Sequence, residues 1–283
     1  MFLNKISNVF GFTVFIMSTL FLFSFCKKER TIDNETQTVI DNSICEQQFN
    51  TIIQTINEKI YGSMSLQGFR INSCESARWI SPSDTTIDNS GAYISSTLPT
   101  FTLNYTELSC LDADGVKKLG KIYITPTHKW TNIKTTMPPI THTLTIGFNN
   151  YSTDGVFIDG KMVVIKNGNT LKTKVEGHCS NSSKTFNITY SSDKSIDLLS
   201  DGSIKVWGTS NGTNRNGKTF VTNINQTNPL IKKNNCKFIS SGLIEVSPQG
   251  FSTRTVNYGS GNCDDDANYT LNGQVIAFKL KNN

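Results

Sequence analysis

Pairs of Asn or Asp followed by Gly recur along this chain and separate runs of alternating polar and apolar residues. Type I′ hairpin turns need positive φ at both central residues, and these pairs adopt it readily. The pairs are Asp114-Gly115, Asp154-Gly155, Asp159-Gly160, Asn167-Gly168, Asp201-Gly202, Asn216-Gly217 and Asn272-Gly273. The alternating runs include 101–105, 141–148, 184–190 and 203–207. We therefore predict a mainly β fold over residues 63–283, an antiparallel meander of hairpins. The pattern leaves open whether the sheet is open, part of a sandwich or closed into a barrel.

A single helical period precedes the strands. Apolar residues recur at spacings of three and four, at Cys45, Phe49, Ile52, Ile53, Ile56 and Ile60. This spacing places them on one face of a helix. Ser43 and Glu46 form a capping box at its start, and Gly62 marks its end. We predict one N-terminal amphipathic α-helix over residues 43–62.

The first residues have the composition of an export signal. A lysine precedes an apolar run over 9–25, which is shorter than the ~20 residues of a membrane-spanning helix. Cys26 follows directly, and then a charged stretch. This order predicts a lipoprotein in which residues 1–25 are removed, Cys26 takes the lipid and residues 26–42 form a polar tether. Phe25 stands where the lipobox usually has a small residue, so an uncleaved anchor and simple secretion are the alternatives.

Charge does not favour nucleic acid as a partner. The 27 basic residues exceed the 22 acidic ones by 5, and this mild excess is spread along the chain. The partner that the sequence predicts is a membrane, reached through the lipid anchor.

Two segments, 72–125 and 234–280, are related units. The four residues 102–105 (T-L-N-Y) reappear at 255–258 (T-V-N-Y). In both units a cysteine precedes this phrase, and a second cysteine and an aspartate follow it. These residues are Cys74, Cys110 and Asp112 in the first unit, and Cys236, Cys263 and Asp265 in the second.

Besides Cys26 the chain has six cysteines, and an even number in an exported chain predicts disulfides. If the two related units fold alike, each contains one equivalent bond, and the remaining two cysteines pair with each other. The predicted bonds are Cys74–Cys110, Cys236–Cys263 and Cys45–Cys179. Six cysteines permit many pairings, so this choice depends on the repeat. The absence of a C-x-x-C pair gives no support to a zinc or redox motif.

These motifs resemble a family of uncharacterised Bacteroidota envelope lipoproteins. That family repeats an N-Y/D-F-G-x-x-x-C pattern and contains the phrase G-T-N-R-N-G, which stands here at 212–217. The resemblance covers most of residues 43–283 and implies no activity. The chain departs from the family pattern at 107–109, where glycines are usual, and by carrying Cys45 and Cys179. The charged residues after Cys26 also resemble anchors of that phylum, which implies export to the cell surface.

Candidate catalytic and metal-binding motifs have simpler explanations. Residues 208–212 spell G-x-S-x-G, but turn residues follow them where a nucleophile elbow needs a helix. Residues 112–115 resemble part of a calcium loop, but Lys121 stands where the bidentate Glu belongs. Asp112 and Asp265 share a repeat position and are the candidates for a cation ligand, although carboxylates in hairpin turns are commoner. We predict no catalytic residue, no cofactor and no metal.

Histidines and tryptophans give no clear site. His128, His142 and His178 are isolated and lack the spacing of a zinc site. The tryptophans Trp79, Trp130 and Trp207 could line a sugar-binding face, although packing in the core is the more frequent role.

We therefore expect a non-enzymatic lipoprotein of the cell envelope, anchored in the outer membrane and exposed at the surface, with secretion as the alternative. It would bind a glycan, lipid or protein ligand, or serve as a structural component. The alternative function is an anchored or secreted hydrolase of glycans or peptides, which would assemble Asp, Glu or His from separate strands.

Overall fold

The computed structural model describes residues 33–61, 75–80, 100–105, 111–112, 115–127 and 141–280. The predicted fold class is confirmed, because one N-terminal helix precedes a fourteen-stranded sheet. The helix is α2 (Gln37–Ile56), and a π-helical turn, η1 (Asn57–Tyr61), follows it. The strands are β1 (Glu75–Ile80), β2 (Thr100–Tyr105), β3 (Lys118–Pro126), β4 (Thr141–Thr153), β5 (Val156–Asn167), β6 (Thr170–Asn181), β7 (Asn187–Leu198), β8 (Ile204–Thr213), β9 (Thr219–Ile224), β10 (Leu230–Lys232), β11 (Ser241–Pro248), β12 (Arg254–Ser260), β13 (Asp266–Leu271) and β14 (Gln274–Lys279).

The strands form an antiparallel meander. They follow one another across the sheet in chain order, with one exception between β8 and β11. There β10 pairs with 204–206 of β8, and β9 pairs with 208–213. Both short strands also pair with β11, so β9 and β10 together occupy one strand position that a turn interrupts.

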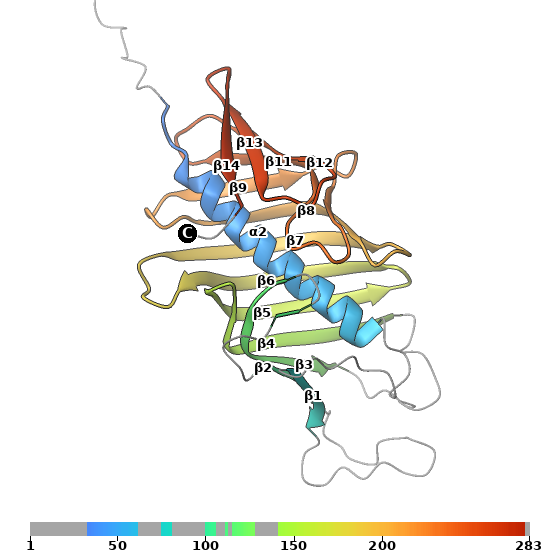
Figure 1. The fold of residues 1–283 in the computed structure, drawn as a ribbon. Coiled ribbons are helices and arrows are strands. Elements are labelled where there is room, and N and C mark those ends of the chain that lie inside the picture. The colour runs from blue at the N-terminus through green and yellow to red at the C-terminus, as the bar shows by residue number, and fades with distance from the viewer. Residues whose placement is uncertain are drawn as a thin grey trace, which may run out of the picture. The chain divides into compact units, whose positions relative to one another are not determined.

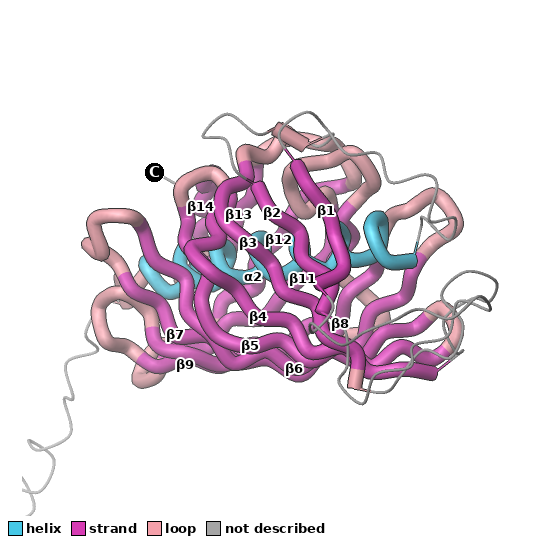
Figure 2. Tube along the Cα trace, turned by 90° about the horizontal axis from the view of Figure 1, so that it is seen from below, coloured by secondary structure: helices cyan, strands magenta, loops and turns pink. Residues whose placement is uncertain are grey.

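Side chains alternate between the two faces of the sheet. In β6 the buried positions include Leu171, Val175 and Cys179, and exposed residues stand between them. Successive side chains of a strand point to opposite faces, so the period of two in the sequence reflects one covered and one open face. The covered face packs against α2, which crosses the concave side of the curved sheet (Figures 1 and 2).

The helix α2 is enclosed on all sides. Of its 20 residues, 18 are buried, and they include charged side chains such as Asp41 and Glu46 as well as the apolar stripe. The predicted apolar stripe is buried. The polar residues on the rest of the helix are buried as well, which the residue pattern of the helix alone does not reveal.

The helix begins at Gln37, six residues before the predicted start at 43 and inside the predicted tether. The capping box was therefore wrong: Ser43 lies within the helix, with its Oγ 3.0 Å from the Tyr258 hydroxyl. At the true start, Glu35 Oε1 accepts hydrogen bonds from the backbone N–H and the hydroxyl of Thr38, both at 2.9 Å. The buried Arg254 Nη2 donates to the Glu35 carbonyl at 2.7 Å. The Glu35 carboxylate thus caps the helix, and an arginine of β12 holds the Glu35 backbone carbonyl.

The predicted Asx-Gly turns have different outcomes. At Asn167-Gly168, Asp201-Gly202 and Asn216-Gly217 only the glycine has positive φ, so these are not type I′ turns. Asp154-Gly155 and Asn272-Gly273 have positive φ at both residues, as a type I′ turn requires. Asp159-Gly160 was wrong as a turn, because both residues lie inside β5. Gly160 pairs with Gly177 of β6, and a Cβ on Gly160 would meet the Glu176 carbonyl oxygen at 2.2 Å. This glycine permits a close approach of two strands rather than a reversal of the chain.

Gly177 allows α2 to pack closely against the sheet. It occupies an inward position of β6, where a Cβ would stand 3.3 Å from the Phe49 ring and 2.4 Å from the Asp159 carbonyl oxygen. The Phe49 ring therefore reaches β6 and stacks on Tyr190 of β7 with ring centroids 5.1 Å apart. Any side chain at 177 would push the middle of α2 away from the sheet.

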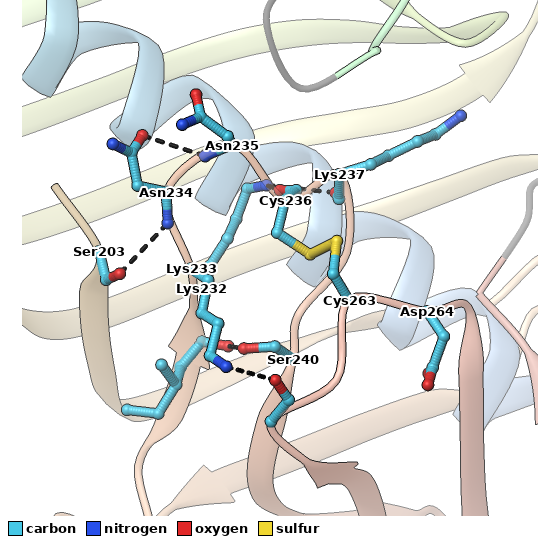
Figure 3. The surroundings of a disulfide bond; sticks show 12 residues. Ser203, Lys232, Lys233, Asn234, Asn235, Cys236, Lys237, Ser240, Cys263 and Asp264 are labelled. Atoms are coloured by element: carbon cyan, nitrogen blue, oxygen red, sulfur yellow. Dashed lines mark hydrogen bonds between the residues drawn. A yellow bond between two sulfur atoms is a disulfide. The ribbon is translucent and has the colours of Figure 1, made fainter. Parts of the chain in front are cut away.

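The predicted Cys236–Cys263 disulfide is present, with Cα atoms 5.7 Å apart (Figure 3). It joins the segment between β10 and β11 to the segment between β12 and β13. The buried Lys232 donates from Nζ to the Cys236 carbonyl, and Lys233 Nζ donates to the Gly261 carbonyl (Figure 3). The related units do not match throughout, because β3 pairs with β2 whereas its counterpart β14 pairs with β13.

The remaining cysteines fall into two groups. Cys26, Cys74 and Cys110 lie outside the described residues. Cys45 of α2 and Cys179 of β6 are fully buried and carry no bond, but their thiols are hydrogen-bonded to one another. Burial raises the pKa of the Cys45 thiol, and Cys179 raises it further, which keeps the thiolate population small.

We predict that the protein, when folded under oxidising conditions, contains the Cys45–Cys179 bond in addition to Cys236–Cys263, because the structure brings these two thiols together. The measurement is peptide mapping by mass spectrometry after digestion without reduction, with a reduced and alkylated sample as the control. The Cys74 peptide is expected to be joined to the Cys110 peptide. Alkylation of Cys45 in the unreduced, unfolded chain, or a peptide joining Cys74 to Cys263, would contradict the pairing.

Candidate functional site

The carboxylate of Glu46 is the centre of a buried polar network between α2 and the sheet. Its Oε1 accepts hydrogen bonds from the Tyr190 hydroxyl at 2.7 Å and from Ser210 Oγ at 3.2 Å. Its Oε2 accepts from Lys194 Nζ, which also lies 2.8 Å from the Tyr190 hydroxyl. β7 supplies the lysine and the tyrosine, and β8 supplies the serine.

Burial shifts the pKa values of Lys194 and Tyr190 in this network. The side chains of Lys194 and Glu46 are 5% and 0% exposed. Burial lowers the pKa of Lys194, although Glu46 acts in the opposite direction. Burial and then Glu46 raise the pKa of Tyr190. Because its members are hydrogen-bonded to one another and shielded from water, the Glu46 network stabilises the position of the helix. It does not offer an acid or a base to a substrate.

Asn214 holds the first turn of α2. It follows β8, and its Oδ1 accepts hydrogen bonds from the backbone N–H groups of Asn216 and Lys218, both at 2.9 Å. Its Nδ2 donates to Thr38 Oγ1 at 2.8 Å. One side chain therefore shapes the β8–β9 turn and attaches it to the helix.

Arg215 adds a charged contact beside it. Its backbone N–H and its Nε donate to the two carboxylate oxygens of Asp41 at 2.8 and 2.7 Å. The guanidinium also lies over the Phe186 ring, 4.6 Å from the centroid. The phrase G-T-N-R-N-G at 212–217 thus acts as a clamp on the N-terminal end of α2.

A second buried group lies near the C-terminal end of α2. Lys118 Nζ of β3 is 2.6 Å from Asp112 Oδ2 and donates to Thr55 Oγ1 at 2.8 Å. The rings of Tyr105 and Tyr151 stand beside it, 5.9 Å apart. Burial raises the pKa of Tyr151 to about 12, although the Lys118 charge counteracts this. Both phenols therefore stay protonated at neutral pH.

The two candidate cation ligands each contact a lysine. Asp112 contacts Lys118, as above, and Asp265 Oδ1 lies 2.8 Å from Lys279 Nζ. In the part of the chain that the structure describes, no group of three or more His, Cys, Asp or Glu could hold a metal ion. Each aspartate is thus placed to compensate a lysine charge.

The other sequence candidates do not come together. Ser210 of the G-x-S-x-G letters lies inside β8 and is buried against Glu46, so no nucleophile elbow exists there. His142 is buried in β4, His178 is exposed on β6, and His128 lies outside the described residues. Trp207 packs against the core. Trp79 stands in β1 without a described side chain, and Trp130 lies outside the described residues.

An open groove of about 600 Å³ lies across the β8–β9–β11 region of the sheet. Two rows of paired residues line it. In the first, Asn211 pairs with Val221, which pairs with Ser247. The second row consists of Thr189, Thr213 and Thr219, and Thr219 Oγ1 donates to Gln249 Oε1 at 2.7 Å. The remaining lining residues are Gly212 and Phe220.

The groove presents hydroxyl and amide groups around one exposed apolar side chain, that of Val221, which we call the platform. Val221 is 58% exposed, and no lining residue carries a charge. The Asn211 amide and the Thr213 hydroxyl have no hydrogen-bonding partner among the described residues, so solvent or a ligand satisfies them. Gly212 lies between them, and a Cβ there would meet the Thr189 carbonyl oxygen at 2.0 Å. The missing side chain lets β7 and β8 approach closely beneath the groove.

Sequence reasoning missed the groove, although the signal was present. The strand period assigns Asn211 and Thr213 to the face opposite Ser210. The chain order does not show that Ser247 of β11 joins them, because β9 and β10 share the strand position between β8 and β11. The residues of the site are common Thr, Ser and Asn that resemble any exposed strand face.

Comparison of the chain with protein-family models, with curated proteins and with solved structures gave no match. Among the described residues, no helix has both the length and the apolar character needed to cross a membrane.

We predict that Glu46→Gln destabilises the protein by about 3–5 kcal/mol, because it leaves the Lys194 charge buried without its counter-charge. The double variant Glu46→Gln with Lys194→Met is expected to recover most of that loss. Urea unfolding followed by tryptophan fluorescence measures both free energies. Lys174→Met is the matched control, since Lys174 and Asp193 form an exposed pair 3.3 Å apart, and its effect should stay below about 1 kcal/mol. If the double variant is as unstable as Glu46→Gln, the loss of stability does not come from the unpaired Lys194 charge.

Proposed function

We propose that this chain is a lipoprotein of the cell envelope whose β domain binds a ligand and does not catalyse a reaction. The observation that carries the proposal is the enclosure of α2. Because the helix fills the concave side of the sheet and 18 of its 20 residues are buried, the outer face is the surface on which a ligand can be held. The groove on that face supplies uncharged polar groups, and its lining contains no His, Asp or Glu that could activate a hydroxyl or form a carboxylate pair.

The distribution of carboxylates also supports binding over hydrolysis. A glycoside hydrolase needs two carboxyl groups that face a common substrate. Asp41 and Glu46 are completely buried, and each is held by a basic partner. The acidic groups inside the domain are thus used for packing the helix.

The anchor belongs to the same proposal. Residues 1–25 act as the signal, Cys26 takes the lipid, and the charged stretch after it directs the protein to the outer face of the outer membrane. The three acyl chains of a bacterial lipoprotein hold a protein far more firmly than one chain does.

We predict that Cys26→Ser releases the protein from the membrane fraction of cells that express the full chain, because the lipidated thiol is lost. Phe25→Ala is the matched control: it supplies the small residue that the lipobox prefers and should leave the protein membrane-bound. Immunoblots of the membrane and soluble fractions measure the outcome, and protease treatment of intact cells should digest the wild-type domain. Full membrane retention of Cys26→Ser would indicate an uncleaved signal anchor instead.

We predict no turnover when the detergent-solubilised full-length protein is incubated with a panel of oligosaccharides and peptides, and retention of some panel members. Chromatography of the products tests hydrolysis, and retention on the immobilised protein tests binding. Turnover that one Asp, Glu or His substitution abolishes would establish the hydrolase instead. Retention of no panel member would favour a structural component without a small ligand.

A further inference from the structure

We infer that the groove across β8, β9 and β11 is a subsite for a neutral oligosaccharide. This inference rests on the proposed binding function and names the chemical class of its ligand. Three features of the groove support it: the side chains that are available for binding, the charges that surround them and the rigidity of the strands that carry them.

Side chains, and not the backbone, must hold a ligand in this groove. β8 pairs with β7 on one side and β9 on the other, and β9 pairs with β11. The backbone N–H and C=O groups of β8 and β9 are therefore used within the sheet, so an extended peptide cannot join them as an added strand. What remains are the hydroxyls, the amides and the Val221 side chain.

These groups match the surface of a sugar. Directly opposed residues of neighbouring strands have Cβ atoms about 5 Å apart, so Asn211, Val221 and Ser247 form a row of amide, apolar platform and hydroxyl. A sugar ring likewise presents hydroxyls along its rim and C–H groups on its face. The exposed Val221 side chain can cover the C–H face while Asn211 and Ser247 exchange hydrogen bonds with the rim.

The electrostatic surroundings disfavour an anionic ligand. In the next row of the sheet, Asp193 pairs with Thr209 and Asn223 pairs with Glu245. Asp193 and Glu245 are both exposed on this flank of the groove, and Asp193 is paired with Lys174 of β6 at 3.3 Å. A phosphate, sulfate or uronate in the groove would meet the Glu245 carboxylate without a cation in the lining to compensate. The chemistry thus selects a ligand without negative charge.

The subsite is also rigid before a ligand arrives. Thr213 directly precedes Asn214 and Arg215, which are fixed to α2 through Thr38 and Asp41. Thr189 Oγ1 accepts a hydrogen bond from the Thr213 backbone N–H at 2.8 Å. Groups fixed in this way lose little conformational entropy on binding, which allows a shallow groove to hold an oligosaccharide.

The test uses the detergent-solubilised full-length protein on an array of immobilised neutral oligosaccharides and of sulfated or uronic counterparts. Val221→Asp places a carboxylate on the platform and should weaken retention on the neutral glycans by at least about tenfold, the effect of about 1.4 kcal/mol. Ile165→Asp is the matched control, because Ile165 is another exposed apolar residue, on β5 and outside the groove lining. It should bind as the wild type does. Asn211→Ala, which adds no charge, should also weaken binding.

The outcomes separate the two proposals. Equal binding of sulfated glycans, or neutral-glycan binding that both Val221→Asp and Asn211→Ala leave unchanged, would overturn the assignment of this groove. Retention of peptides but no glycan would overturn the sugar assignment and leave the proposed binding function standing. Retention of neither class would overturn both.

Discussion

The burial of a polar helix is the constraint on which this structure depends. A helix that packs with one face leaves its polar residues in water, but α2 places Asp41, Glu46 and several amides inside the protein. Each buried charge must then find a partner, because an unpaired one costs several kcal/mol, on the order of 3–5. Glu46 meets Lys194 and Asp41 meets Arg215. The sheet therefore has to supply basic and hydroxyl side chains at defined inward positions, which makes its interior polar along the helix.

This requirement explains what the sequence could and could not predict. The period of two and the Asx-Gly pairs predicted the meander because they report on local backbone geometry. The start of α2 was missed because residues 37–42 are polar and resemble a tether, and their partners lie far away in the chain. Arg215, for example, is separated from Asp41 by 174 residues. The turn predicted at Asp159-Gly160 is absent for a related reason. Its glycine allows β5 and β6 to approach closely, and the local sequence does not show that these strands pair.

The candidate site was harder to predict than the fold. The motifs with chemical meaning, such as G-x-S-x-G and the acidic turns, serve the structure: Ser210 binds Glu46, and Asp112 and Asp265 compensate lysines. The groove residues Asn211, Thr213 and Val221 have no motif of their own. Nothing in the phrase G-T-N-R-N-G itself predicts a contact with a helix, and the structure gives it a physical role as the clamp on α2.

The helix network and the groove depend on the same strand register. Along β8, Ser210 points inward to Glu46, and Asn211 points outward into the groove. A slip of one residue would exchange the two faces, placing Asn211 against the carboxylate and removing it from the groove. The Glu46 network opposes such a slip, because Ser210 also hydrogen-bonds to Thr222 of β9. Gly212 opposes it as well, because no other residue fits beside the Thr189 carbonyl. The outer surface is therefore fixed by interactions that lie entirely on the inner one.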